Sequence, residues 1–118
     1  MRVNTVNQRI TDTINKIIEL LVQRKYQELE RLCRGCRLTA VEIEQAIHDY
    51  NCELITPPDI DFESIDIIEI TNSSPRAWSV RYDLWTKEEG RSDLSLEATL
   101  IDNGDNFLTV EIDNIHVL

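Results

Sequence analysis

The segment Trp78–Leu118 constrains the fold most, because its apolar and polar side chains alternate through three strand-length runs joined by two turns that contain glycine. Alternation with a period of two indicates a strand with one buried face and one solvated face. Short turns between such runs join antiparallel neighbours. We therefore expect strands over residues 77–86, 92–101 and 106–113, preceded by another over residues 64–70.

The first half of the chain predicts three helices. Apolar residues recur at steps of three and four over residues 4–24, which indicates an amphipathic helix that covers the sheet. A second helix follows and is expected to end at Gly35, since glycine commonly stops a helix. Thr39 begins the third helix, because Glu42 three residues later completes a capping box, and this helix should end near Asn51.

This order of elements predicts one α+β domain over residues 1–118. The N-terminal helices of residues 1–52 are expected to pack on one face of a four-stranded antiparallel sheet formed by residues 59–118. A chain of 118 residues has the length of one ordinary domain. Pro57-Pro58 holds an extended connector between the two parts.

Turn chemistry sets the expected strand register. We expect three-residue loops at residues 88–90 and 102–104, each with glycine in the left-handed conformation. The first loop sets apolar residues opposite one another: Leu84 with Leu94, Tyr82 with Leu96, Val80 with Ala98 and Trp78 with Leu100. A two-residue turn at Asn103-Gly104 would set apolar residues against polar ones in the second hairpin, so we reject it. The three-residue loop instead pairs Ala98 with Leu108, Leu96 with Val110 and Leu94 with Ile112.

The charge of the chain is strongly asymmetric. Residues 1–58 hold eight basic and eight acidic residues, whereas residues 59–118 hold four basic and fourteen acidic ones, which accounts for the net charge of −10. Nucleic acids and anionic membranes both need a basic surface, so neither is an expected partner. A basic protein partner fits this charge better.

In the expected register, the outward face of the sheet gathers carboxylates around one tryptophan. A tryptophan rimmed by polar side chains is typical of an interface anchor. The predicted partner-binding residues are therefore Trp85, Asp83, Asp93, Glu111 and Asp113. Because no catalytic residues form a recognisable arrangement, we expect a non-enzymatic binding protein, for example an immunity protein that neutralises a basic toxin.

Neither a metal nor another cofactor is expected. Cys33-Arg34-Gly35-Cys36 is a CxxC motif, but zinc needs four ligands and no second CxxC is present. A redox CxxC normally begins a helix, whereas this one is expected to end a helix, although its arginines would favour thiolate. The carboxylates do not have the spacing of an EF-hand loop. An odd number of cysteines, no export signal and no membrane-spanning run predict reduced thiols in a cytoplasmic protein.

Two alternatives remain open. A pocket between the helices and the sheet would bind a small ligand or substrate and would be lined by Tyr50, Trp78, Tyr82 and His48. A homodimer would instead use the acidic surface only to remain in solution.

Residues 83–94, DLWTKEEGRSDL, and residues 110–118, VEIDNIHVL, resemble a small family of uncharacterised bacterial domains. That resemblance implies no particular activity. The order of helices followed by a curved antiparallel sheet is similar to cystatin-like and nuclear-transport-factor-like α+β rolls, which implies a fold but no function.

Overall fold

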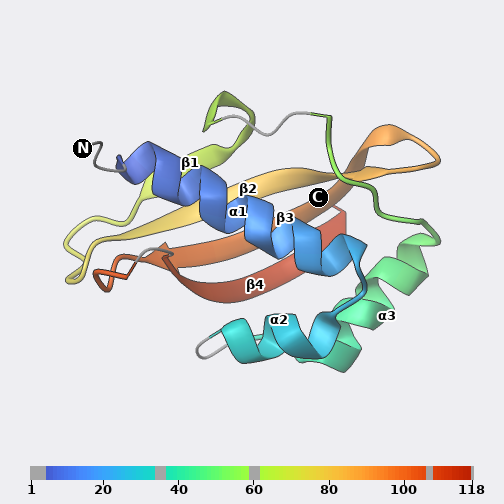
Figure 1. The fold of residues 1–118 in the computed structure, drawn as a ribbon, viewed down its shortest axis with the longest axis horizontal. Helices are drawn as coiled ribbons and strands as arrows, with labels where there is room; N and C mark the ends of the chain where they lie inside the picture. Colours follow the sequence, from blue (N-terminus) through green and yellow to red (C-terminus); the bar gives the residue numbers. More distant parts are fainter. Residues whose placement is uncertain (1–4, 34–36, 59–61, 106–107, 118) are drawn as a thin grey trace.

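The helices precede the strands along the chain, and α1 lies across one face of an antiparallel sheet (Figure 1). The structure is a computed structural model that describes residues 5–33, 37–58, 62–105 and 108–117. The helices are α1 (Val6–Val22), α2 (Tyr26–Leu32), α3 (Ala40–Tyr50) and the short 3-10 helix η1 (Phe62–Ser64). The strands, in the order β1-β2-β3-β4 across the sheet, are β1 (Asp66–Glu69), β2 (Ala77–Thr86), β3 (Gly90–Ile101) and β4 (Thr109–Val117). The predicted α+β class is confirmed.

Helix α1 forms because its apolar side chains share one face and its first turn is capped. The Thr5 hydroxyl accepts a hydrogen bond from the backbone N–H of Gln8 at 3.1 Å, which satisfies one free donor of the first turn. The stripe that includes Ile10, Ile14 and Ile17 is fully buried. It belongs to the same apolar core as the inward side chains of β2, β3 and β4.

The capping box predicted for α3 is present. The Glu42 backbone N–H donates to the Thr39 hydroxyl at 3.2 Å, and the Glu42 carboxylate accepts from the Thr39 N–H at 3.0 Å. Asn51 ends the helix in the left-handed conformation, with φ 57°. The predicted end of the second helix at Gly35 lies outside the described residues, and α2 already ends at Leu32.

The register between β2 and β3 is confirmed over most of its length. Trp78 lies opposite Leu100, Val80 opposite Ala98 and Tyr82 opposite Leu96. The predicted pairing of Leu84 with Leu94 is wrong, because the ladder shifts beyond Asp83 and Trp85 pairs with Arg91. Thr86 then pairs with Gly90, which moves the loop to residues 87–89.

The predicted register between β3 and β4 is wrong. Ala98 faces Ile112 rather than Leu108, Leu100 faces Val110, and beyond a second irregularity at Glu97 the pairs are Leu96 with Ile115 and Leu94 with Val117. The ladder begins with Ile101 opposite Thr109, so the connection is longer than the expected three-residue turn. The first residues of the strand predicted over 106–113 lie outside the described residues.

Other parts of the chain pair with two edges of the sheet. The segment 53–55 lies along the edge of β2 beyond β1: the Ile55 N–H donates to the Trp85 carbonyl and the Lys87 N–H to the Glu53 carbonyl, both at 2.9 Å. At the opposite edge, Cys33 forms a bridge with Val110 of β4, and the Arg37 N–H donates to the Ile112 carbonyl at 3.2 Å. This leaves β1 as the edge strand on its side of the sheet.

Candidate functional site

The structure divides the predicted partner-binding residues into separate groups. Asp83 and Trp85 lie near the end of β2 that joins the β2–β3 hairpin. Glu111 lies opposite Thr99 on β4, and Asp113 accepts a hydrogen bond from the Thr99 hydroxyl at 2.8 Å. Thr99 pairs with Ser79 rather than with Asp83, so the β4 carboxylates lie further along the outward face, away from the hairpin. The altered β3–β4 register is the reason for this separation.

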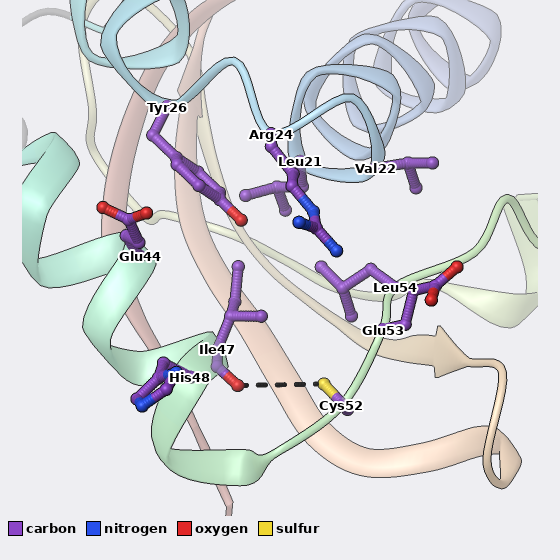
Figure 2. A pocket seen from close by; sticks show the side chains of 10 residues that line it. All are labelled: Leu21, Val22, Arg24, Tyr26, Glu44, Ile47, His48, Cys52, Glu53 and Leu54. Carbon is purple, nitrogen blue, oxygen red and sulfur yellow. Dashed lines mark hydrogen bonds between the residues drawn. The ribbon is translucent and has the colours of Figure 1, made fainter.

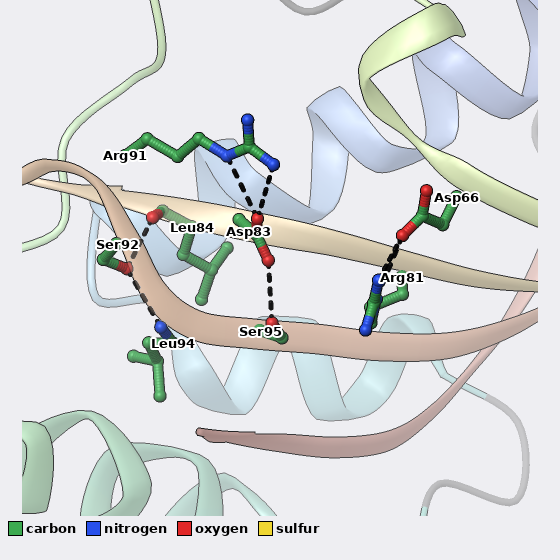
Figure 3. A network of polar contacts seen from close by, with 8 residues as sticks. All are labelled: Asp66, Arg81, Asp83, Leu84, Arg91, Ser92, Leu94 and Ser95. Carbon is green, nitrogen blue, oxygen red and sulfur yellow. Dashed lines mark hydrogen bonds and ion pairs between the residues drawn. The ribbon is translucent and has the colours of Figure 1, made fainter. Parts of the chain in front are cut away.

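Carboxylates of the outward face are mostly matched by neighbouring donors. Asp83 accepts from Arg91 at 2.8 Å and from the Ser95 hydroxyl at 2.9 Å (Figure 3). Burial alone would raise the pKa of Asp83, but the hydrogen bonds from Arg91 and Ser95 outweigh it, so its pKa is lowered. Other pairs on this face join Arg81 with Asp66, His116 with Glu97, and Arg37 with Asp113.

A basic protein is the partner expected for the acidic face, and at the hairpin end four carboxylates without an ion-pair partner among the described residues lie together. We define the acidic cluster as Glu53, Glu88, Glu89 and Asp93, all of which are exposed. None of them forms an ion pair with any residue in the described part of the chain. The cluster combines the turn between β2 and β3, the start of β3 and the segment that follows α3.

Hydrogen bonds hold this cluster together. The Glu53 backbone N–H donates to the Glu88 carboxylate at 3.0 Å, and the Tyr50 hydroxyl donates to the Glu89 carboxylate at 2.6 Å. The hydrogen bond with Glu89 is the main reason why the pKa of Tyr50 is raised, and the negative charges of Glu89 and Asp93 act in the same direction. Asp93 thus lies close to Tyr50 at the end of α3. The C-terminal end of α3 and the hairpin therefore form one continuous acidic surface.

Trp85 lies beside this surface and is half-buried. A Cβ atom added to Gly90 would lie 3.6 Å from the Trp85 ring, and Gly90 itself has a φ of 73°. The indole also lines a small hollow of about 100 Å³ together with Ser64, Asp83 and Arg91. The tryptophan therefore combines a packed edge with an accessible one, next to the acidic cluster.

A second concave feature lies where α1 ends and α2 begins (Figure 2). It has a volume of about 170 Å³, and its lining includes Leu21, Val22, Arg24, Tyr26, Glu44, Ile47, His48, Cys52, Glu53 and Leu54. The Arg24 guanidinium and the Tyr26 hydroxyl both point into it. Burial is the main reason why the pKa values of Tyr26 and Cys52 are raised.

The residues predicted to line a ligand pocket have different surroundings. His48 lies on the rim of this cavity, whereas Tyr50 faces the hairpin. Trp78 and Tyr82 are buried in the core beneath α1. The CxxC motif is described only at Cys33, because Cys36 lies outside the described residues.

Sequence reasoning found Asp93 of the acidic cluster but missed Glu53, Glu88 and Glu89. The signal for Glu88 and Glu89 was present, since two adjacent carboxylates in a turn are necessarily solvated. Glu53 carried no local signal, because its place depends on pairing between distant segments.

Among the described residues, no group of three or more histidine, cysteine, aspartate or glutamate side chains is arranged to hold a metal ion. None of the helices in the described part of the chain has both the length and the apolar character needed to cross a membrane.

Comparison with known proteins gives one match. No curated protein and no solved structure is significantly similar to the chain. The model of DUF7668, a domain of unknown function, matches residues 18–118. The match covers most of the sequence, and the chain therefore belongs to the DUF7668 family.

Proposed function

We propose that this protein is a non-enzymatic binding domain that docks a basic protein segment on the acidic cluster beside Trp85. The observation that supports the proposal most is which carboxylates form ion pairs and which do not. Asp83 and Asp113 on the sheet form ion pairs with arginines, whereas Glu53, Glu88 and Glu89 lie together and form no ion pair with the residues that the structure describes. The proposal thus moves the docking surface from the middle of the sheet to the hairpin end.

The carboxylates of the acidic cluster create a local electrostatic field beside Trp85. Like charges held close together raise the negative potential at one place and attract a positively charged partner, which increases the association rate. Carboxylates already bonded to arginine contribute little to such a field. Trp85 would supply apolar contact area at the rim, as aromatic anchors do in many interfaces.

The proposed class of partner is a basic protein, and an immunity-like or regulatory role fits such a partner. We also propose that the family is bacterial and that the fold is analogous to cystatin-like or nuclear-transport-factor-like rolls. Shared layout alone carries no function, so the argument depends on the charges of the cluster.

The test measures binding of a fluorescent ten-residue lysine peptide by anisotropy at near-physiological salt. The cluster variant is Glu88→Gln/Glu89→Gln/Asp93→Asn. The matched control is Glu19→Gln/Glu63→Gln/Asp105→Asn, which changes the net charge equally at exposed positions outside the cluster. Since each exposed charge acts through a local field, we expect the cluster variant to lose about tenfold or more in affinity and the control to lose only a few-fold.

Equal losses in the two triple variants would overturn the proposal, because they would show that only total charge matters. Binding that does not weaken as salt rises would also contradict it, since screening reduces attraction between exposed charges. Circular dichroism of each variant establishes that the fold is retained.

A second candidate is the binding of a small zwitterion in the cavity at the start of α2. It is favoured by the Arg24 guanidinium and Tyr26 hydroxyl that point into the cavity, with the carboxylates of Glu44 and Glu53 also among its lining residues (Figure 2). Arg24 and Tyr26 would hold a carboxylate, and Glu44 an ammonium group. The two candidates differ in their sensitivity: Arg24→Gln would abolish this binding and leave peptide binding at the acidic cluster intact.

A further inference from the structure

The edge strand β1 exposes backbone groups that the fold does not use. The Ile70 N–H donates to the Ala77 carbonyl at 2.9 Å, and Ile68 lies opposite Ser79 in the same register. Because hydrogen-bonded pairs alternate along an antiparallel ladder, the peptide groups of Ile67 and Glu69 point away from β2. No residue in the described ranges forms a hydrogen bond with these outward groups.

Apolar side chains accompany this open edge. Ile68 is 72% exposed and Ile70 is 39% exposed, although both are β-branched residues that normally pack in sheets. Exposed edge strands are usually protected by charge, proline or a covering segment, because they can pair with another strand. On β1, the residue at the centre of the exposed side is instead isoleucine.

The charges beside β1 are locally balanced, unlike those at the hairpin end. Asp66 is bonded to Arg81, and Glu69 accepts two hydrogen bonds from Arg76, at 2.9 and 3.0 Å. Arg76 also lies 5.0 Å from the centre of the Trp78 ring. A second chain that carries a net charge of −10 would meet least repulsion at such a balanced surface.

We propose that β1 pairs with β1 of a second copy of this chain, antiparallel about a two-fold axis that passes beside Ile68. The two four-stranded sheets then form one continuous sheet. Ile67 of each copy exchanges backbone hydrogen bonds with Glu69 of the other, which uses the outward peptide groups. This surface is distinct from the acidic cluster and does not depend on its function.

The outward face beside β1 has room for this contact. A groove of about 420 Å³ is lined by Asp66, Ile67, Ile68, Ser79, Val80, Arg81 and Glu97. In the proposed register, Ile68 side chains of both copies meet on this face as a pair without direct hydrogen bonds, where side chains approach most closely. One neighbouring register would place Ile68 opposite Asp66 of the second copy, and the other would place the Glu69 carboxylates of the two copies directly opposite each other, so we reject both.

The first arm of the test is oxidative cross-linking of Ile68→Cys. The Cα atoms of an antiparallel pair without direct hydrogen bonds lie about 4.5 Å apart, which falls within the range for a disulfide. We expect a covalent dimer whose disulfide joins position 68 of the two copies, identified by peptide mapping. Ile70→Cys is the matched control, because the two copies of position 70 lie far apart in this register.

The second arm is sedimentation of the full chain over a range of concentrations. Because β1 has only four residues, we expect a weak dimer that is populated at high protein concentration. Ile68→Lys should abolish it, whereas Val41→Lys, at a similarly exposed β-branched residue of α3 with 74% exposure, should not. Higher salt should favour the dimer by screening repulsion between the acidic copies.

A chain that remains monomeric at every concentration would overturn the proposal. So would a dimer that survives Ile68→Lys, or cross-linking of Ile70→Cys that equals that of Ile68→Cys. A peptide from another protein that binds this edge while the chain stays monomeric would also contradict it.

Discussion

At the scale of single residues, Ser92 shows how a side chain replaces backbone pairing. Its hydroxyl donates to the Leu84 carbonyl at 2.6 Å and accepts from the Leu94 N–H at 3.2 Å, at the place where the β2–β3 ladder shifts (Figure 3). Ser92 is only 4% exposed, so water does not readily take its place. The serine therefore satisfies buried backbone groups that the irregular register leaves without strand partners.

Ser92→Ala should destabilise the protein by about 1–3 kcal/mol, because it leaves a buried carbonyl and a buried N–H without this partner. Urea unfolding followed by circular dichroism measures the change. Ser79→Ala, at an exposed position on β2, serves as the control and should have little effect. Equal stability of the two variants would show that the Ser92 hydroxyl is not needed at the bulge.

Contacts between residues close together in the sequence could be predicted, whereas hydrogen-bond and ion-pair partners that depend on the three-dimensional arrangement could not. Thr39 and Glu42 are three residues apart, so their capping box follows from sequence alone. Arg81 lies opposite Glu97 on β3, but its guanidinium bonds Asp66 on the other neighbouring strand. A long side chain on a central strand can reach acidic residues on both neighbouring strands, and the sequence does not show with which of them it forms an ion pair.

At the scale of elements, the β3–β4 hairpin explains the largest error of the sequence prediction. Between Ala98 and Ile101 the true register differs from the expected one by an even number of residues, as Ala98 faces Ile112 instead of Leu108. An even shift keeps the apolar side chains of this part on the inward face, so matching apolar residues could not distinguish the two registers there. Beyond Glu97 the irregularity adds one residue to the shift, as Leu96 faces Ile115 instead of Val110. The longer connection is held by α1: the Leu108 N–H donates to the Thr13 hydroxyl at 3.2 Å.

Arg9 makes the corresponding contact at the other end of this connection. Its guanidinium donates to both carboxylate oxygens of Asp102, at 2.8 and 3.1 Å, and to the Asp105 carbonyl at 2.7 Å. The two paired side chains are 16% and 25% exposed. The hydrogen bond from Arg9, followed by one from the Gly104 N–H, holds the pKa of Asp102 below its ordinary value.

Arg9→Ala should therefore destabilise the fold by about 1–2 kcal/mol at neutral pH. Because the pKa of Asp102 is lower in the folded state, this stabilisation is present above the ordinary aspartate pKa of about 3.9 and is lost as pH falls through the lowered value. The stability difference from wild type should thus shrink in strong acid to what the hydrogen bond to the Asp105 carbonyl contributes. Thermal unfolding across pH measures it, with Lys16→Ala on the same helix as the control.

A difference between wild type and Arg9→Ala that stays constant down to strongly acidic pH would contradict this account. It would indicate that Arg9 acts by packing rather than by its bond to the Asp102 carboxylate.

At the scale of the whole molecule, the order of the elements and the negative net charge could be predicted from the sequence. The position on the surface of the carboxylates that form no ion pair with described residues could not. Alternation over Trp78–Leu118 is strong enough to define the sheet, and helical periodicity defines α1. The expected acidic face assumed that Glu111 and Asp113 lie beside Asp83. The register separates them, and arginines from β3 and the segment after α2 approach Asp83 and Asp113.

The two proposed surfaces should respond to salt in opposite directions. Attraction of a basic partner to the acidic cluster weakens as exposed charges are screened, whereas association of two acidic copies through β1 strengthens. A salt titration should therefore distinguish binding of a basic partner at the hairpin end from self-association at the β1 edge.

The measurement that tests the docking claim most directly is an NMR chemical-shift map of the 15N-labelled protein titrated with the ten-residue lysine peptide. We predict that the largest shifts affect the backbone amides of residues 50–54 and 85–93, and that Glu88→Gln/Glu89→Gln/Asp93→Asn removes them. Largest shifts along β4, around Arg24 and Tyr26, or spread evenly over the surface would contradict docking at the acidic cluster.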